Sequence, residues 1–255
     1  MGAEDPQDTT SKSNGWSGRA RAEQYDDEGN RAFYRAAVAR LLEKAPVLAG
    51  RGLDLGCGTG FSLEGLLESA PAVTWTGADW SRRMLQLARE KKGLRAASLC
   101  VARAEALPFA DGSFDVVVAN FSWHWFGREA GPEVRRVLRP GGWFLACLPL
   151  RRFSNVPGNR ALARALLAGR DHFTRRSSQG FRFADVPHVL PGETRVIRHE
   201  LVVVNECFAD GGQLLDVLGS RGALAAIFGE QPPTAIVSPS PVDFEWPFAV
   251  LHAQI

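Results

Sequence analysis

The sequence has few cysteines, and none of them form a close pair. Four cysteines occur among 255 residues, and no two stand in a Cys-x-x-Cys motif, which argues against a zinc site. We expect no metal ion, and we expect the thiols to be reduced, as in a reducing compartment. The cysteines are Cys57, Cys100, Cys147 and Cys207.

Long apolar runs and a strong charge of one sign are also absent. No stretch of about 18 apolar residues occurs, so we expect no transmembrane helix. Residues 1–18 are mostly polar, and we expect a disordered tail there rather than a signal peptide, and a cytoplasmic protein. The net charge of +2 gives no strong attraction to nucleic acid or to a membrane, and we expect neither as a partner.

Short apolar segments alternate with helix-like segments five times between about residues 50 and 150. This order predicts an α/β fold, in which a mostly parallel sheet has helices on both faces. Ser81 is a favourable N-cap for a helix at 82–91, and Pro140 stops a helix predicted at 129–138. The predicted strands are Leu53–Leu55, Val73–Ala78, Ser98–Val101, Phe114–Ala119 and Trp143–Leu148.

The flanking segments suggest how the domain is completed. Apolar spacing predicts one helix over residues 19–44, and late strands at 196–207 and 245–253 with a helix at 212–228 would complete a seven-stranded sheet. We expect one domain over 19–255. Its parts are a helical cap (19–47), a cofactor-binding core (48–150), an arginine-rich lid inserted at 151–195 and a sheet completion (196–255).

The start of the expected lid is rich in arginine. Residues 151–182 hold eight arginines and a single acid, Asp171. Arginine suits the capture of a carboxylate or the docking of an acidic carrier protein, which makes Arg151 and Arg152 candidate substrate residues. A solvated charged surface is the alternative, and the segment has no aromatic spacing typical of nucleic-acid binding.

The motif LDLGCGTG at residues 53–60 carries the clearest chemistry. A strand that runs into a glycine loop and then a helix lets the backbone approach a ligand closely. Its GxGxG spacing differs from the GxGxxG spacing of dinucleotide sites, which argues against an NAD-dependent oxidoreductase. Asp79, at the end of the second predicted strand, can accept hydrogen bonds from a ribose diol.

Four blocks of sequence resemble the class I S-adenosylmethionine-dependent methyltransferases. They are LDLGCGTG, GADWSRRML, AEALPFADGSFDVVVANFSWHWF and EVRRVLRPGGW, in that order within residues 53–143. The resemblance implies a Rossmann-like fold, S-adenosylmethionine as the cofactor and S-adenosylhomocysteine as its product. The cofactor-binding residues that it implies are Tyr25, Asp54, Gly56, Cys57, Gly58, Gly60, Asp79, Trp80, Met84, Ala104, Glu105 and Asn120.

One position departs from the family pattern. An acidic residue that accepts the adenine amino group is common two positions before Glu105, and this chain has Arg103 there. Arginine cannot accept a hydrogen bond. This departure leaves open a non-methylating protein of the same fold, acting as a binding protein or a cyclase.

A weaker resemblance extends over the whole chain, to the biotin-pathway malonyl-acyl-carrier-protein O-methyltransferases. It rests on Arg19–Tyr25, Ser122–Trp125, Phe208–Asp210 and Trp246–Phe248. It implies methyl transfer to the free carboxylate of an acyl thioester on acyl carrier protein, an acidic partner that would dock at 151–182. The alternative is a small-molecule O-, N- or C-methyltransferase of secondary metabolism.

The aromatic stretch around His124 holds the candidate acceptor site. A carboxylate acceptor needs no general base, whereas a hydroxyl or amine would want one. His124 is the candidate base, and a histidine that merely lines the pocket is the alternative. Trp123 and Trp125 are candidate substrate residues, with packing in the core as their alternative.

Overall fold

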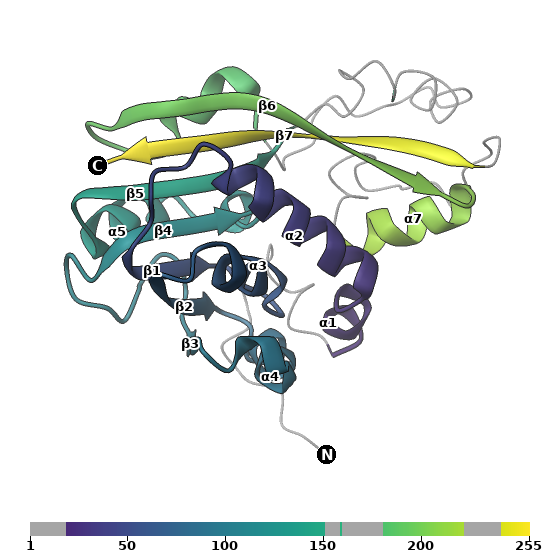
Figure 1. The fold of residues 1–255 in the computed structure, drawn as a ribbon, viewed down its shortest axis with the longest axis horizontal. Helices are drawn as coiled ribbons and strands as arrows, with labels where there is room; N and C mark the ends of the chain where they lie inside the picture. Colours follow the sequence, from purple (N-terminus) through teal and green to yellow (C-terminus); the bar gives the residue numbers. More distant parts are fainter. Residues whose placement is uncertain (1–18, 151–158, 160–180, 222–240) are drawn as a thin grey trace.

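The computed structural model describes residues 19–150, 159, 181–221 and 241–255 (Figure 1). Its strands form one sheet of seven in the order β3-β2-β1-β4-β5-β7-β6. Neighbours from β3 to β5 pair in parallel, whereas β7 runs antiparallel to both β5 and β6. The strands are β1 (Gly50–Leu55), β2 (Val73–Asp79), β3 (Ser98–Val101), β4 (Phe114–Asn120), β5 (Leu138–Pro149), β6 (Arg195–Phe208) and β7 (Val242–Gln254). The mostly parallel, seven-stranded sheet predicted from the sequence is confirmed.

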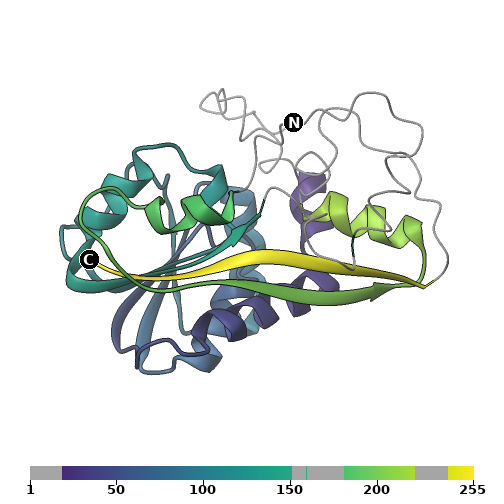
Figure 2. The same cartoon turned by 90° about the horizontal axis from the view of Figure 1, so that it is seen from above.

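Helices cover both faces of the sheet, and Figure 2 shows α2 and α5 on opposite sides of it. Apolar side chains of α2, α3 and α4 pack on one face, and those of α5 and η4 pack on the other. Because β4 is buried on both faces, its sequence reads as a continuous apolar run. The helices are α1 (Arg19–Tyr25), α2 (Glu28–Leu42), α3 (Phe61–Ser69), α4 (Arg82–Glu90), α5 (Ala130–Val137) and α7 (Gly211–Ser220), with 3-10 turns η1 (Lys92–Leu94), η2 (Trp123–Trp125) and η4 (Phe183–His188).

The single N-terminal helix predicted over residues 19–44 is wrong. The first helix ends at Tyr25, and Asp27 takes an extended conformation (φ −115°) as the N-cap of α2. Its carboxylate accepts a hydrogen bond from the Asn30 backbone N–H at 2.9 Å. An aspartate in this position favours a new helix start over a continuous helix, so the chain turns between α1 and α2.

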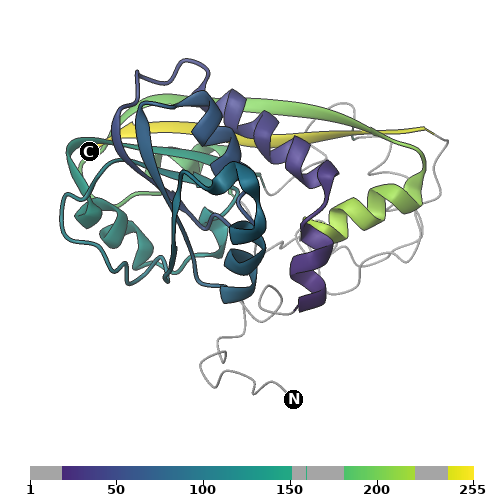
Figure 3. The same ribbon diagram turned by 60° about the horizontal axis from the view of Figure 1, so that its bottom comes forward.

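The last two strands are longer than the sequence predicts. Pairing of β5 with β7 ends at Pro149 opposite Phe248, whereas β6 and β7 stay paired as far as Phe208 opposite Val242. The two strands therefore project past the rest of the sheet as a ribbon (Figure 1). Helix α7 packs on this ribbon through a small apolar cluster that includes Leu214. Figure 3 shows α7 beside α1, so the helix that packs on the ribbon also contacts the first helix of the described chain.

Several predictions fall outside the described residues. They include the tail at 1–18, most of the lid at 151–195 with Arg151 and Arg152, and the end of the helix predicted at 212–228. The division into cap, core, lid and sheet completion therefore stays a prediction. Within the described part, no helix has the length and apolar character needed to cross a membrane.

Candidate functional site

Three polar residues meet at the carboxyl edge of the sheet. Asp54 lies near the end of β1, and Asp79 and Asn120 are the last residues of β2 and β4. Because β1 pairs in parallel with both of the other strands, all three residues lie at the same edge. All three side chains are buried. Ligands of open α/β sheets bind at this edge, so it is the candidate site.

Asp79 is braced by the backbone on both of its oxygens. It accepts hydrogen bonds from the Gly58 N–H at 2.9 Å and from the Ser81 N–H at 2.8 Å. Burial raises the pKa of Asp79 to about 6, and these two bonds oppose the rise. The carboxyl group is therefore mostly ionised at neutral pH, and it links the glycine loop to the start of α4.

Asp54 has fewer hydrogen-bond partners than Asp79. Its Oδ2 atom is buried and has no hydrogen-bond partner. Burial and, secondarily, repulsion by Asp79 raise the pKa of Asp54 to about 8. A buried carboxyl with a free oxygen is destabilising unless a donor or a cation pairs with it. The side chain can therefore receive a positively charged ligand group.

The glycine loop is closed at both ends and open in its middle. Gly56, Gly58 and Gly60 all have positive φ angles, of 75°, 55° and 91°. A Cβ atom on Gly56 would lie 2.5 Å from the Ser122 Cβ, and one on Gly60 would lie 2.2 Å from a Leu94 methyl group. On Gly58 the nearest atom would be a Tyr25 ring carbon at 3.7 Å. Of the three glycines, Gly58 alone has space for a methyl-sized group before the Tyr25 ring is reached, and we call this space the Gly58 opening.

Tyr25, the last residue of α1, lies over this opening. Its ring stacks on Phe61 with centroids 5.9 Å apart and stands 5.5 Å from Tyr34. Burial, together with Tyr34 and the charges of Asp79 and Asp54, raises the pKa of Tyr25 well above its usual value. The predicted cofactor residue Tyr25 is thus brought together with both acids and the loop.

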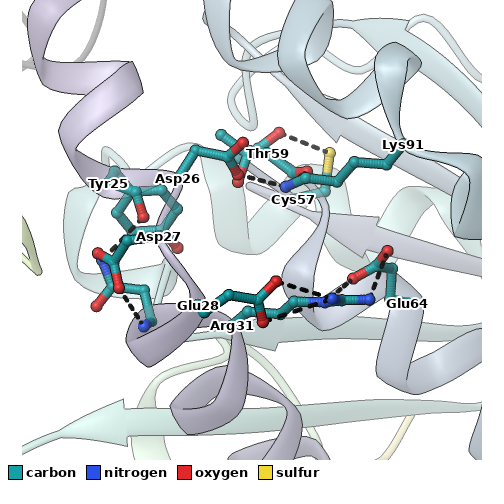
Figure 4. A network of polar contacts seen from close by, with 11 residues as sticks. Tyr25, Asp26, Asp27, Glu28, Arg31, Cys57, Thr59, Glu64 and Lys91 are labelled. Carbon is teal, nitrogen blue, oxygen red and sulfur yellow. Dashed lines mark hydrogen bonds and ion pairs between the residues drawn. The ribbon is translucent and has the colours of Figure 1, made fainter.

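Figure 4 shows the contacts that hold the α1–α2 turn against the glycine loop. Lys91 donates to Asp26 and to the Thr59 carbonyl, the latter at 2.7 Å, and its ammonium lies 3.8 Å from the centre of the Phe61 ring. On the other side of the turn, Arg31 pairs with the Glu64 carboxylate of α3 at 2.9 Å. These contacts fix the cap to the core.

Asn120 presents a free acceptor at the same edge. Its amide nitrogen donates to the Ser62 hydroxyl at 2.8 Å and to the Tyr34 carbonyl at 3.3 Å. Because a carbonyl only accepts, these contacts fix which way the amide is turned. The Oδ1 atom is buried and has no partner. The next residue, Phe121, has a φ of 53°, a conformation that bulky side chains rarely adopt and that is concentrated at functional sites.

The aromatic stretch after β4 is a 3-10 turn whose residues differ in burial. Trp123 packs in the core with its ring 4.9 Å from that of Phe144. His124 is half-buried, and burial lowers its pKa to about 3, so the ring is neutral and weakly basic. The Trp125 ring lies 4.7 Å from the His124 ring.

The predicted adenine-side residues follow β2 and β3. Glu105 accepts from the Gly127 N–H at 2.6 Å and pairs with Arg103 at 3.6 Å. Ala104 and Met84 are buried, and Trp80 is half-buried directly after Asp79. Arg103, the residue that departs from the family pattern, thus points toward Glu105 and forms an ion pair with it.

Cys57 lies buried in the glycine loop. Its thiol lies 3.9 Å from the Gly58 carbonyl, and burial raises the pKa of the thiol well above its usual value. The thiol therefore stays protonated and serves as a small packing group.

Sequence reasoning missed the residues that support the site. Tyr34 and Ser62 orient Asn120, the Ser122 hydroxyl donates to the Leu55 carbonyl at 2.6 Å, and Lys91 joins the loop to the cap. These contacts join segments far apart in the chain, so no local pattern marks them. Only the Asp26-Asp27 pair could be recognised from the local sequence, because aspartate favours the N-cap position that Asp27 takes.

Comparisons with known proteins agree with this geometry. Residues 53–146 match the family described as "Methyltransferase domain". The demethylmenaquinone methyltransferase of Thermus thermophilus is 43% identical over 112 residues, which are 42% of this chain and 50% of that protein. The fatty-acid O-methyltransferase of Mycolicibacterium smegmatis is 34% identical over 146 residues, 55% of this chain and 52% of that protein.

A third relative is the malonyl-[acyl-carrier protein] O-methyltransferase of Alcanivorax borkumensis. It is 36% identical over 138 residues, 52% of this chain and 46% of that protein. The chain thus spans about half the length of the curated relatives it matches.

A solved structure extends the likeness of fold over most of the chain. The YcgJ protein from Bacillus subtilis superposes with a TM-score of 0.56 at 19% identity, covering 86% of this chain and 97% of that one. Its low identity bears on the fold alone. The match over residues 53–146 shows that this chain contains a methyltransferase domain, and the strand order is that of the class I methyltransferase fold.

Proposed function

We propose that this protein transfers the methyl group of S-adenosylmethionine to a carboxylate. The observation that carries the cofactor assignment is the pair of buried acids beside the open glycine loop. Asp54 has a buried oxygen with no partner and an elevated pKa, which is the chemistry that an ammonium group relieves. Gly58 has space above its backbone for a methyl-sized group, with the Tyr25 ring next to it.

Each part of the cofactor has a matching group in the chain. Asp54 and the free Oδ1 of Asn120 would accept from the ammonium of the methionine tail, beside the glycine loop. Asp79 keeps lone pairs for the ribose hydroxyls beyond its two backbone bonds. Trp80 would pack on the adenine, and Tyr25 would close over the bound molecule. Met84, Ala104 and Glu105 complete the adenine side.

The chemistry asks little of the protein beyond alignment. When bound, the sulfonium supplies an already activated methyl group. The residues of this chain therefore bind, orient and exclude water, and such alignment can contribute about 7–11 kcal/mol to lowering a barrier. Tyr25, Tyr34 and Phe61 pack together beside Gly58 and would keep water away from a cofactor bound there.

A carboxylate acceptor fits the absence of a strong base at His124. With a pKa lowered to about 3, this imidazole is far from the range in which a general base works at neutral pH. A carboxylate needs no deprotonation to attack. Two of the similar relatives are named as O-methyltransferases, one of a fatty acid and one of a malonyl-acyl carrier protein. In the same proposal, Arg151 and Arg152 begin the arginine-rich segment that would capture the acceptor carboxylate or an acidic acyl carrier protein at 151–182.

A demethylmenaquinone-like acceptor is the second candidate. The Thermus thermophilus demethylmenaquinone methyltransferase has the highest of the three identities quoted above, 43% over 112 residues. This segment covers the cofactor core, which supports the cofactor more than the acceptor. Trp125 beside His124 would offer an aromatic surface to such a ring.

Alkali stability of the product separates the two candidates. The protein is incubated with S-adenosylmethionine labelled in its methyl group and, in turn, with a malonyl thioester on acyl carrier protein, a fatty acid and a demethylmenaquinone. A methyl ester loses its label as volatile methanol in alkali, whereas a carbon-bound methyl group stays. We expect alkali-labile label with a carboxylate acceptor. Stable label with the quinone alone would favour the second candidate, and no transfer to any acceptor would contradict the carboxylate proposal.

A further inference from the structure

Arg221, the residue after α7, is a buried cation with a full set of partners. Its side chain is 3% exposed. The guanidinium donates with both terminal nitrogens to Glu206 of β6, one of them at 2.9 Å, and its Nε donates to the Asn30 Oδ1 at 2.8 Å. It also lies over the adjoining rings of Phe33 and Trp246, at 4.0 and 4.6 Å from their centres. Arg221 thus joins the end of α7 and the ribbon to the N-terminal cap.

The Asn30 side chain connects Arg221 to the backbone of Tyr25 by hydrogen bonds. Its amide nitrogen donates to the Tyr25 carbonyl at 2.8 Å and to the Ser220 hydroxyl at 3.1 Å. The amide is turned in one way only, because its oxygen accepts from Arg221 while its nitrogen faces a carbonyl. An unbroken path of hydrogen bonds therefore runs from Glu206 through Arg221 and Asn30 to the end of α1.

The end of α1 needs such anchors. The helix has seven residues, and helices this short are not stable in isolation. Tyr25 is its last residue, and the Tyr25 ring is the nearest group above Gly58. A small change in the direction of the chain at Tyr25 would therefore move the ring relative to the opening in the glycine loop.

We propose that Arg221 is a positioning residue for cofactor binding, which holds Tyr25 over the glycine loop through Asn30. This inference rests on the function proposed above. It makes the affinity for the cofactor depend on the β6–β7 ribbon, which carries none of the cofactor residues named above. Because the bond from Arg221 to Asn30 is made by Nε, the guanidinium shape matters as well as the charge.

Arg198 provides a matched control. Its side chain is 7% exposed, it pairs with Glu200 on the same strand, and it donates to main-chain carbonyls at the end of α2, including that of Arg40 at 3.1 Å. It is thus as buried as Arg221 and also joins β6 to the cap. It has no bond to Asn30 or Tyr25, so a purely structural role for buried arginines would affect both residues alike.

The test compares Arg221→Lys, the double variant R221M/E206Q and Arg198→Lys with the wild type. Lysine keeps the charge opposite Glu206 but loses the Nε–H, and the double variant removes both charges so that neither is left buried alone. Calorimetry measures the dissociation constant of S-adenosylhomocysteine, thermal unfolding measures stability, and hydrogen exchange follows the amides of residues 25–31 in the ligand-free protein.

We expect Arg221→Lys to unfold near the wild-type temperature yet to weaken S-adenosylhomocysteine binding about tenfold, or about 1.4 kcal/mol. Amide exchange at residues 25–31 should become faster in both Arg221 variants. Arg198→Lys should change affinity less than about twofold. Wild-type affinity in both Arg221 variants, or equal losses in the Arg198 variant, would overturn the inference. Failure of the wild type itself to bind would instead defeat the proposed function, and this inference with it.

Discussion

Two buried charged sites in the described part of the molecule, one at Arg221 and one at the sheet edge, are built in opposite ways. At the end of α7, Arg221 is surrounded by acceptors and aromatic rings, and its opposite charge, Glu206 of the ribbon, lies in direct contact. At the sheet edge, Asp54 and Asp79 are two neighbouring acids that form no ion pair with any described residue, and both pKa values are raised.

The difference separates a structural charge from a binding charge. A buried ion pair with all its bonds made is complete without a ligand. Two buried acids with an unpartnered oxygen are destabilising in the free protein, and binding sites tolerate such a cost where a ligand relieves it. We therefore read the sheet edge as the place that is completed by a ligand and the ribbon as its support.

Of all the substitutions proposed, replacing Asp79 should reduce the affinity for S-adenosylhomocysteine most. We expect Asp79→Asn to weaken S-adenosylhomocysteine binding about a hundredfold, because a charged acceptor of hydrogen bonds is lost together with one of the braces to Gly58 or Ser81. Calorimetry measures the affinity. Asp115→Asn is the control, since Asp115 is an acid at the opposite, amino end of β4, where it accepts from the Arg51 N–H. Equal losses in the two variants would contradict the assignment.

Asp54→Asn should make the free protein more stable while weakening cofactor binding. We expect affinity for S-adenosylhomocysteine to fall about thirtyfold, and the ligand-free protein to become more stable at pH 8 by about 2 kcal/mol, because a buried charge is removed. Chemical denaturation at several pH values measures the stability. A variant that loses stability at pH 8 would show that the Asp54 carboxylate has a partner in the free protein.

The stability of the wild-type protein should also depend on pH through Asp54, and the direction of the change can be predicted. The pKa of Asp54 is raised from 3.8 to about 8 by folding. Between these values the unfolded chain is ionised while the folded protein holds the proton, so the folded state binds more protons and its stability falls as pH rises. We expect this fall from about pH 4 to about pH 8 to be less steep in Asp54→Asn.

Two glycines of the loop should separate binding from stability. A methyl group on Gly58 meets only the Tyr25 ring at ordinary distance, whereas one on Gly60 would lie 2.2 Å from Leu94. We expect Gly58→Ala to weaken cofactor binding about tenfold, with a stability loss of about 1–2 kcal/mol from its positive φ. Gly60→Ala should destabilise more, by about 2–4 kcal/mol. The reverse order in thermal unfolding would contradict the opening at Gly58.

The smallest effect is expected at His124. If the acceptor is a carboxylate, His124→Asn should change turnover less than about threefold and leave its pH profile unchanged. Loss of an ionisation from that profile together with a large loss of turnover would identify His124 as a base and exclude the carboxylate proposal.

Sequence reasoning reached the central sheet and the two acids because their signals are local. Apolar strands of the buried sheet are continuous runs, and Asp54 and Asp79 stand directly at strand ends beside a glycine loop. The edge strand β6 carries mixed polar and apolar residues, so its full length gave a weaker signal.

The support of the site could not be found in the same way. Asn30 and Arg221 are 191 residues apart, and their bond depends on how α7 packs against the N-terminal cap. The burial of Trp123 against Phe144 likewise depends on a 3-10 turn that places the ring under β5. Such contacts arise from tertiary packing, for which neither propensity nor spacing has a signal.

Proton release on cofactor binding tests the central claim most directly. At pH 7 the free protein holds a proton on Asp54, and an ammonium placed beside it lowers that pKa and expels the proton. Calorimetry of S-adenosylhomocysteine in phosphate and in Tris buffer counts the protons released. We predict micromolar binding with release of about one proton by the wild type and none by Asp54→Asn. Binding without proton release, or no binding at about 1 mM, would contradict the account.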